Sequence, residues 1–468
     1  MTTPNRNRIL ALISVPAALG LLGAGSWGVG RVFHDPSLPS AQIVHASPET
    51  LNYACSPGII NPFDLDGKVA SPTLWNSAGT IEKERNFQVL HADTSAKTLP
   101  ASLGVLGQGG GELRGLSMSS CQLPSTDQWS VLGSSTTGED LVLTFANPNS
   151  SPSVVSLEAF GLNGPLDVKT HQLTVPAHST QSVLAGGLFP EETALVLHVR
   201  ADGQGVATWT QSSAMQGETP KGTTTIPAAR PREETVLQGV SIQGTSTLRL
   251  FVPPSGNSDD ASAHVSLSYT SEAGTFNVPG GEMDISAGTV VDVPLSGMTD
   301  DRYTLRVHAD RALVAQIVTN TEQEEYSEGS RWAMRSSIAA SPALIRAELP
   351  SSQRVESMVR ESLSATALRA TAQEKPSGVS EIHSRLIITP VHSQSGVQLS
   401  LGTQTVTVEA GKTLSMDLPS SDSVVLESPS QVAVALEVEA QTPSGTLRAL
   451  WPLSADDVEQ ASAAITIN

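Results

Sequence analysis

The sequence predicts an all-β protein in which an N-terminal transmembrane helix precedes about three tandem immunoglobulin-like antiparallel β-sandwich modules. Three observations support this fold class. A pattern of two strands and a turn occurs three times, and an uncharged apolar run precedes all three copies. The chain of 468 residues also has the length of about three domains.

Each copy of the repeat has a strand, a second strand in which apolar and polar residues alternate, and a turn around an alanine. The second strands cover residues 154–160, 264–270 and 396–402, and the turns contain Ala177, Ala287 and Ala410. The turns are 110 and 123 residues apart, which is too long for the roughly 40–50-residue blades of a β-propeller. Alternation with a period of two buries one face of a strand, so several such strands predict antiparallel sandwiches.

The repeats and the composition between them divide the chain into successive segments. We expect a cytoplasmic tail (1–8), a transmembrane helix (9–30), a stalk (31–53), a disulfide-tethered pre-domain (54–125), module 1 (126–218), module 2 (232–322), module 3 (340–456) and a C-terminal tail (457–468). An insertion at 352–380 in module 3 is rich in Ser, Ala, Arg and Glu and resembles no strand. It is predicted to be a loop or a short surface helix.

The ends of modules 1 and 2 resemble each other. Residues 197–207 align with residues 305–315, and each segment is predicted to form a hairpin whose turn carries Asp202 or Asp310. Residues 224–231 and 337–342 follow these segments and are predicted to be linkers.

The apolar run at 9–30 contains no charged residue and is long enough for a membrane span of roughly 20 helical residues. Arg6 and Arg8 precede it and Arg31 follows it. The excess of positive charge on the N-terminal side of the run predicts that the short N-terminal tail is cytoplasmic. We therefore expect a single-pass plasma-membrane protein with most of its chain extracytoplasmic. The alternative is a signal peptide that is cleaved near Ala24 or Ala46.

Cys55 and Cys121 are the two cysteines of the chain, and both follow the apolar run. An even pair in an oxidising compartment predicts a disulfide rather than part of a metal site. A closed loop of 66 residues would stabilise the fold by about 4 kcal/mol. The pre-domain needs such a tether, because it contains the glycine-rich segment 107–111 and shows little alternation.

The net charge of −19 and the dispersed Lys and Arg residues argue against a nucleic-acid partner. Aromatic residues make up only 4% of the chain, so the cores must consist mainly of Val, Leu, Ile and Ala.

Several short motifs suggest chemistry but lack the required spacing. Residues 410–413 (AGKT) resemble the end of a phosphate-binding loop, yet Val406 occupies the position of its first glycine. A hairpin turn is the favoured interpretation. Asp64 and Asp66 are spaced like part of a calcium loop whose other ligand positions are absent. A solvated Asx turn is favoured there, with a looser calcium site as the alternative.

The remaining candidates are isolated polar residues. They are His198 and His308, expected on a sheet surface, and the loop pairs Asp259–Asp260 and Asp300–Asp301. Histidines without a partner four residues away and adjacent loop carboxylates do not predict a metal site or a glycosidase pair. We therefore expect no catalytic residue, cofactor or metal site.

Residues 121–165 carry a family resemblance. A Cys and a Trp precede a glycine turn, a strand ending in Asn-Pro, and a strand ending Gly-x-x-Gly-Pro. Here these are Cys121, Trp129, Gly133–Ser134, Asn147–Pro148 and residues 161–165. This pattern, which continues through 175–180 and 226–231, resembles an actinobacterial family of membrane-anchored cell-envelope proteins of unknown function. One glycine of the turn is absent here, and module 3 is shorter. The resemblance implies an envelope setting alongside glycan-polymer assembly machinery.

These features predict a non-catalytic, membrane-anchored extracytoplasmic scaffold or protein-binding protein of the cell envelope. The alternative is a string of carbohydrate-binding modules on wall glycan, although the aromatic residues that stack on sugars are few and scattered. The expected partners are an envelope protein or cell-wall glycan, and the membrane through the N-terminal helix. The sequence does not predict an oligomeric state.

Overall fold

The computed structural model describes residues 42–46, 50–93, 100–131, 133–166, 171–241, 244–254, 262–298, 302–322, 333–364, 379–393, 395–421, 423–443, 445–453 and 463–467. The chain forms two compact units, residues 1–48 with 458–468, and residues 49–457. In the first unit, β1 (Gln42–Ala46) pairs antiparallel with β33 (Ala463–Ile467), so the predicted stalk and C-terminal tail contribute paired strands.

The predicted membrane helix at 9–30 lies outside the described residues. Within the described ranges, no helix is long and apolar enough to cross a membrane.

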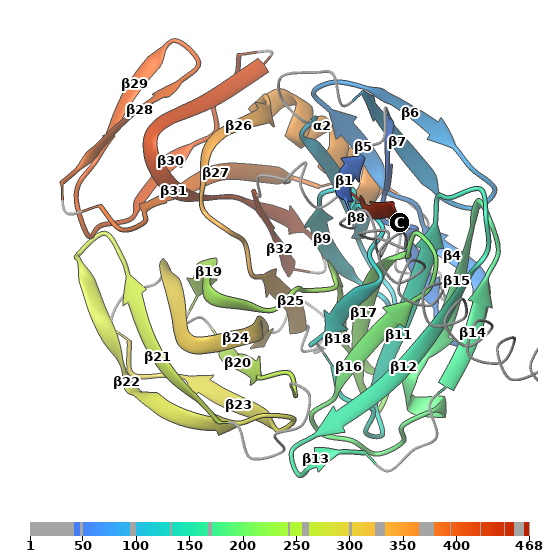
Figure 1. Ribbon diagram of the computed structural model, residues 1–468. Coiled ribbons are helices and arrows are strands. Elements are labelled where there is room, and N and C mark those ends of the chain that lie inside the picture. Colours follow the sequence, from blue (N-terminus) through green and yellow to red (C-terminus); the bar gives the residue numbers. More distant parts are fainter. Residues whose placement is uncertain are drawn as a thin grey trace, which may run out of the picture. The chain divides into compact units, whose positions relative to one another are not determined.

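The prediction of an all-β fold is confirmed in the unit 49–457, which consists of several sheets (Figure 1). The pre-domain contains three small sheets, ordered β2-β7-β6, β3-β4 and β5-β8-β9, and β2 brings the last residues of the predicted stalk into it. Its strands are β2 (Thr50–Ala54), β3 (Ile59–Asn61), β4 (Asp64–Ala70), β5 (Thr73–Asn76), β6 (Thr80–Lys83), β7 (Gln88–Asp93), β8 (Ser102–Gln108) and β9 (Gly115–Ser119). The predicted disulfide between Cys55 and Cys121 is present, and it joins the end of β2 to the segment after β9.

The three modules share one strand order. Module 1 consists of β10 (Asp127–Ser130), β11 (Glu139–Asn147), β12 (Ser153–Gly161), β13 (Gly164–Pro165), β14 (His171–Val175), β15 (Ser179–Leu184), the 3-10 turn η1 (Ala185–Gly187), β16 (Val196–Ala201), β17 (Ala207–Gln216) and β18 (Thr219–Pro227). Module 2 consists of β19 (Arg232–Ser241), β20 (Thr245–Phe251), β21 (Ser262–Thr270), β22 (Thr275–Ser286), β23 (Val290–Leu295), β24 (Arg302–Glu322) and β25 (Ala333–Ala339). Module 3 consists of β26 (Leu344–Pro350), α2 (Ser352–Leu363), β27 (Glu381–Pro390), β28 (Val397–Leu401), β29 (Gln404–Val408), β30 (Leu414–Asp417), β31 (Ser423–Thr442) and β32 (Gly445–Pro452).

Each module has two layers with a common core of four strands each, and β13 adds a short fifth strand to one layer of module 1. In module 1 the layers are β10-β16-β12-β14 and β15-β11-β17-β18. Modules 2 and 3 repeat this order, with β24 and β31 each running through both layers in place of β16 and β17. The prediction of β-sandwiches is therefore correct, but the immunoglobulin order is not reproduced. β11 pairs with β15 and β12 with β16, as B–E and C–F do in an immunoglobulin domain. The outer strands differ, because β10 pairs with β16 and β17 pairs with β11, so these two strands lie in the opposite layers from strands A and G of an immunoglobulin domain.

The predicted hairpins at 197–207 and 305–315 are instead crossings between the two layers. β16 lies in one sheet and β17 in the other, while β24 makes the same crossing without a break. The aspartates at the two crossings make equivalent hydrogen bonds. Asp202 Oδ1 accepts a hydrogen bond from Val154 N at 2.6 Å, and Asp310 Oδ1 accepts one from His264 N at 2.9 Å. Each carboxylate thus satisfies a backbone donor near the start of the third strand.

The repeated turn also links opposite layers and is therefore not a hairpin. It follows β14 in module 1, β22 in module 2 and β29 in module 3. The residue after the alanine has a positive φ in every copy, 51° at His178, 79° at Gly288 and 67° at Gly411. Glycine adopts this left-handed conformation at little cost, which explains the Ala-Gly dipeptide in two of the copies.

The last strand of each module and the last strand of the pre-domain meet at the centre of this unit (Figure 1). We call β9, β18, β25 and β32 the hub; each contacts the next, and β32 contacts β9 to close the ring. Thr224 Oγ1 lies 2.6 Å from Ser337 Oγ, and Thr225 N donates to Ser117 Oγ at 2.9 Å. The predicted linkers at 224–231 and 337–342 are thus wrong in large part, because their small polar residues are buried in hub strands.

The helix α2 provides a second contact between module 3 and the pre-domain, in addition to that between β32 and β9. Ser351 caps its N-terminus by accepting a hydrogen bond from Arg354 N. Its apolar face packs against β8 of the pre-domain, where Leu363 covers Gly107 and Gly109. The expected surface helix is therefore partly a core element, and Leu103 and Val359 belong to one hydrophobic cluster.

Candidate functional site

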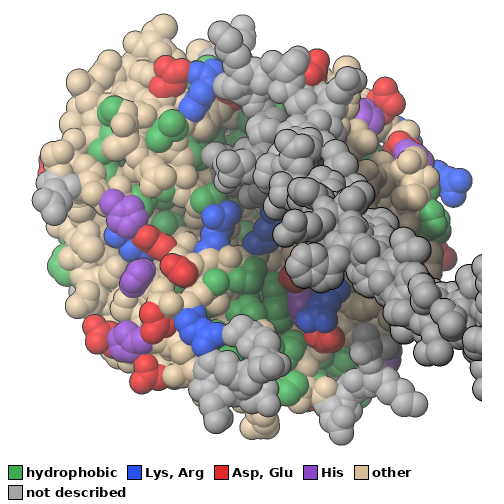
Figure 2. Space-filling view, in the orientation of Figure 1, with side chains coloured by type: hydrophobic (Ala, Val, Ile, Leu, Met, Phe, Trp, Pro, Cys, Tyr) green, Lys and Arg blue, Asp and Glu red, His purple; other side chains and the backbone are tan. Residues whose placement is uncertain are grey.

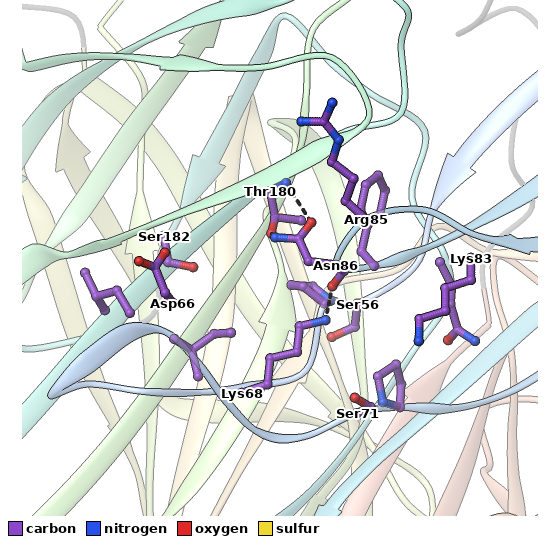
Figure 3. A pocket seen from close by; sticks show the side chains of 15 residues that line it. Ser56, Asp66, Lys68, Ser71, Lys83, Arg85, Asn86, Thr180 and Ser182 are labelled. Carbon is purple, nitrogen blue, oxygen red and sulfur yellow. Dashed lines mark hydrogen bonds between the residues drawn. The ribbon is translucent and has the colours of Figure 1, made fainter.

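A polar cavity of about 460 Å³ lies where the pre-domain meets β15 of module 1 (Figure 3). Its walls come from the segment after Cys55, from β4, from the turn between β6 and β7, and from β15. The lining residues are Ser56, Pro57, Ile60, Leu65, Asp66, Lys68, Ser71, Pro72, Lys83, Arg85, Asn86, Phe87, Gln88, Thr180 and Ser182. This cavity is the candidate functional site.

The charge of the cavity is opposite to that of the chain. Lys68, Lys83 and Arg85 line it together with one carboxylate, Asp66, whereas the whole chain has 27 Lys and Arg against 46 Asp and Glu. In the described part of the chain, none of the three cations forms an ion pair with a carboxylate. An uncompensated cluster of cations attracts anions.

Lys68 is the cation most affected by its surroundings. Its ammonium group donates a hydrogen bond to the backbone carbonyl of Asn86, toward which it points in Figure 3. Burial lowers the pKa of Lys68, and the nearby charge of Lys83 lowers this pKa further. A bound anion would counter the second effect because it favours the charged amine.

Module 1 fixes the wall that carries these cations. Asn86 Nδ2 donates to Thr180 Oγ1 at 2.5 Å, and Thr180 N donates to Asn86 Oδ1 at 3.2 Å. Glu84 Oε1 lies 3.1 Å from Nδ1 of His178, the residue with positive φ in the repeated turn. The turn therefore connects module 1 to the pre-domain beside the cavity.

The same turn makes inter-module contacts in module 3. There, Thr275 Oγ1 of module 2 donates to Gly411 O at 2.9 Å, and Thr413 N donates to Ser271 O at 2.9 Å. In modules 1 and 3 the turn therefore both connects the two layers and contacts a neighbouring part of the chain.

The opposite wall is held by the disulfide and by a buried glutamine. Cys55 N donates to Gln88 O at 2.9 Å, and the cysteine directly precedes the lining residues Ser56 and Pro57. Gln211 of module 1 binds both backbone groups of Ile60, with distances of 2.8 and 2.9 Å. The cavity is thus built from well-anchored backbone and does not depend on a ligand to form.

A smaller cleft of about 140 Å³ lies between modules 1 and 2. It contains two bidentate ion pairs, Arg335 with Glu139 and Arg249 with Asp292. Because each guanidinium is already neutralised, these groups hold the modules together rather than offering a charged site.

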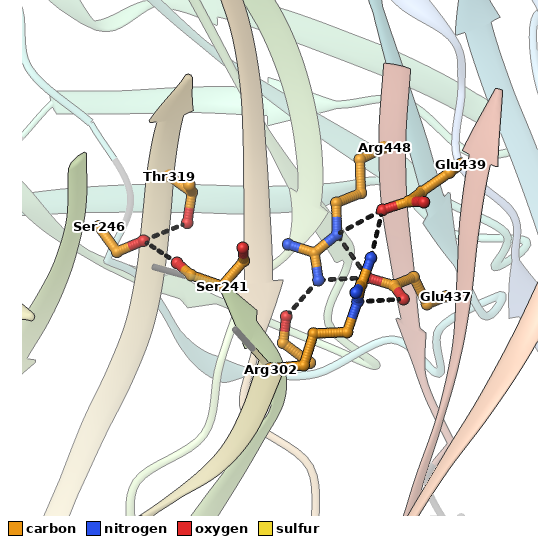
Figure 4. A network of polar contacts seen from close by, with 8 residues as sticks. Ser241, Ser246, Arg302, Thr319, Glu437, Glu439 and Arg448 are labelled. Carbon is orange, nitrogen blue, oxygen red and sulfur yellow. Dashed lines mark hydrogen bonds and ion pairs between the residues drawn. The ribbon is translucent and has the colours of Figure 1, made fainter. Parts of the chain in front are cut away.

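Modules 2 and 3 are joined by a buried ionic network (Figure 4). Glu437 is 1% exposed and accepts hydrogen bonds from Arg448 Nε at 2.5 Å and Arg302 Nε at 2.9 Å. Arg302 also binds Glu439, and Arg448 donates to Gly239 O at 2.6 Å. A buried carboxylate with several charged donors is a satisfied structural group.

The structure separates the polar residues that the sequence suggested. Asp64 and Asp66 are both exposed in β4, and of the two only Asp66 lines the cavity. No group of three or more His, Cys, Asp or Glu side chains suited to a metal occurs among the described residues. The pairs Asp259–Asp260 and Asp300–Asp301 lie outside them. The AGKT segment forms the turn of module 3.

The two candidate histidines have different environments. His308 lies on an exposed position of β24, as expected. His198 is only 5% exposed, so its expected surface position is wrong. It stacks on Trp129 with a ring separation of 3.9 Å and contacts Asp127 and Glu158 at 3.0 and 3.4 Å. The alternation of β16 could not reveal this, because β10 pairs with β16 and brings Trp129 opposite His198.

Acidic and basic side chains are interspersed on the face shown in Figure 2, where histidines lie beside acidic side chains. His264 contacts Asp284 at 2.9 Å, and His392 contacts Glu234 at 2.9 Å. The hydrogen bond to Asp284 is the main cause that raises the pKa of His264.

Sequence reasoning missed the cavity cations, because β4 carries Lys68 while Lys83 and Arg85 follow on another strand and its turn. The sequence offered little signal, because residues 68–85 hold these three cations together with Glu82 and Glu84.

Comparison with known proteins gives one family match. The model of a family of unknown function, DUF5719, matches residues 82–419, from β6 to the segment after β30. No curated protein matches the chain.

Proposed function

The chain belongs to the DUF5719 family of unknown function, and we propose that it is a non-catalytic extracytoplasmic scaffold or protein-binding protein of the cell envelope. In this proposal the N-terminal segment anchors it in the plasma membrane, as the uncharged run at 9–30 suggests. A setting beside glycan-assembly machinery and an actinobacterial source belong to the proposal through the resemblance of residues 121–165.

The closed ring of pre-domain and modules is the observation that supports a scaffold best. Ring closure between β32 and β9 fixes surfaces from four parts of the chain relative to one another. The buried ionic groups Arg335 and Glu437 join neighbouring modules and are satisfied by partners there. A partner that binds to a pre-ordered surface avoids the entropy cost of ordering flexibly linked modules.

A carbohydrate-binding string is the second candidate, and the tryptophans argue against its usual form. Trp129, Trp209 and Trp451 are at most 3% exposed, so they cannot stack on a sugar. Trp75 packs against the hydrophobic core.

Crosslinking and mass spectrometry in intact cells would test the scaffold. We expect a reproducible envelope protein neighbour for the full chain, and loss of that neighbour when Glu437→Gln loosens modules 2 and 3. The exposed substitution Glu409→Gln is the matched control. A neighbour that is equally enriched with both variants would contradict dependence on the ring, and no enriched neighbour would contradict the scaffold role.

The anchor needs a separate measurement. We expect the full chain in the membrane fraction with protease-sensitive modules outside intact spheroplasts. Release of the full-length chain by a carbonate wash would contradict the anchor.

A further inference from the structure

We propose that the cavity between the pre-domain and module 1 binds a polyhydroxylated anion, a sugar carrying a carboxylate or a phosphate group, with the anionic group beside Lys68 and Lys83. Such a ligand site is a function beyond the scaffold role. It requires neither the membrane anchor nor a protein partner.

The cations of the cavity favour an anionic ligand. Lys68 and Lys83 are close enough for the charge of Lys83 to affect Lys68, and no carboxylate within the described chain neutralises either one. Arg85 follows Lys83 by two residues, and its side chain extends away from Lys68 in Figure 3. An anion between the two lysines removes their mutual repulsion, and charge-assisted hydrogen bonds to carboxylate or phosphate are among the strong ones.

The uncharged polar groups of the cavity favour a ligand that also carries hydroxyl groups. Hydroxyls of Ser56 and Ser71 and the amide of Gln88 line the same space, where they can donate to or accept from ligand hydroxyls. Asp66 lies beside Ser182 in Figure 3 and adds an acceptor at some distance from the lysines. A carboxylate repels a simple anion but accepts hydrogen bonds from hydroxyl groups, so its presence favours a ligand that has both.

The apolar lining and the size of the cavity also suit a sugar. Pro57, Ile60 and Leu65 contribute apolar surface of the kind that packs against the C–H face of a sugar ring. The volume of about 460 Å³ lies within the range of roughly 300–1,000 Å³ that is usual for small-molecule sites. The disulfide and Gln211 hold the walls in place, so that little binding energy is needed to order the site.

Isothermal titration of the full chain in detergent tests the proposal with four probes: glucuronic acid, glucose 6-phosphate, glucose and inorganic phosphate. We expect at least one of the two anionic sugars to bind, and about tenfold or greater weakening for glucose, as the loss of a charged hydrogen bond predicts. Preference for one anionic sugar identifies carboxylate or phosphate as the natural group. Equal binding of glucose, or equally tight binding of inorganic phosphate, would overturn the combined anion and hydroxyl recognition.

Substitutions locate the site. Lys68→Gln and Lys83→Gln are each expected to weaken the anionic sugar by about tenfold or more, while Lys68→Arg retains most of the affinity. Lys412→Gln removes an exposed charge of module 3 that is paired with Glu409, and it serves as the matched control. Thermal unfolding of each variant verifies folding. Unchanged affinity in folded Lys68→Gln and Lys83→Gln proteins, or no binding of either anionic sugar, would refute the proposal.

Discussion

Arg335 in β25 of module 2 binds Glu139 in β11 of module 1 through two nitrogen–oxygen contacts of 2.6 and 2.8 Å. The guanidinium also donates to Ser212 Oγ at 2.7 Å and to Asn320 Oδ1 at 3.0 Å. The side chain of Arg335 is only 8% exposed. One arginine near the end of module 2 therefore joins the sheets of two modules, so the modules are not independent units on a flexible string.

Glu139→Gln is expected to lower the free energy of unfolding by about 2 kcal/mol. The substitution leaves the buried guanidinium without its anionic partner, and the partial exposure of Glu139 limits the loss. Urea unfolding measures the effect. Glu409→Gln, which breaks an exposed pair with Lys412, should change stability by no more than about 0.5 kcal/mol. Equal effects of the two substitutions would show that the Arg335 contact contributes no stability.

Replacement of both Cys55 and Cys121 by serine should destabilise the pre-domain by about 4 kcal/mol. Without the crosslink, the unfolded chain regains the conformational entropy of a 66-residue loop. The walls of the cavity should loosen as well, since Cys55 directly precedes two lining residues. Hydrogen exchange of residues 56–72, compared in the oxidised and serine forms, reports both effects. Unaltered exchange in the serine form would contradict the role assigned to the disulfide.

Asp202→Ala and Asp310→Ala should each lower the free energy of unfolding by about 0.5–1.5 kcal/mol, because each removes the acceptor of an exposed backbone donor at the layer crossing. Asparagine at either position keeps a side-chain oxygen and should recover most of the loss. Parallel thermal melts of the alanine and asparagine variants make the comparison. If alanine and asparagine behave alike at both sites, the aspartates do not act through these hydrogen bonds.

The affinity of the cavity for an anionic sugar should fall as the pH rises through the lowered pKa of Lys68. The free protein loses the proton of Lys68 more easily than an ordinary lysine does, and an anion favours the charged amine, so binding takes up a proton in that range. Lys83, Arg85 and Asp66 are the other charged groups that line the cavity. Titrations at several pH values should show a shallower dependence for Lys68→Arg, because arginine remains charged. The same slope in both proteins would assign the proton to another group.

The strand pattern could be predicted because it is a local property. In β21, the alternating residues Val265, Leu267 and Tyr269 are buried as the sequence indicated, and β28 repeats the pattern at Val397 and Leu399. A strand with one buried face records that face in its own sequence.

The hub could not be predicted, because its strands are covered by partners far away in the chain. Thr224 and Ser337 look like linker residues, yet they are buried against each other across 113 positions. The close approach of hub backbones favours such small side chains; a Cβ on Gly115 would lie 1.9 Å from Thr223 O.

Two apparent irregularities of the sequence have one explanation. The glycine-rich segment at 107–111 and the insertion at 352–380 have no obvious relation in the sequence. In the structure, Leu363 of α2 packs over Gly107 and Gly109, where a larger residue would meet the helix. The cavity was equally hidden, because its cations come from separate strands that only the fold brings together.

A cysteine pair that spans the first and last parts of the ring provides the most direct test of ring closure. Thr73 in β5 and Ser362 in α2 are 289 residues apart, and their hydroxyl oxygens are 3.3 Å apart. In the double variant Thr73→Cys, Ser362→Cys, non-reducing peptide mapping should find a disulfide between these positions beside the native Cys55–Cys121 bond. Free thiols at both positions under oxidising conditions would contradict the ring and favour a linear string of modules.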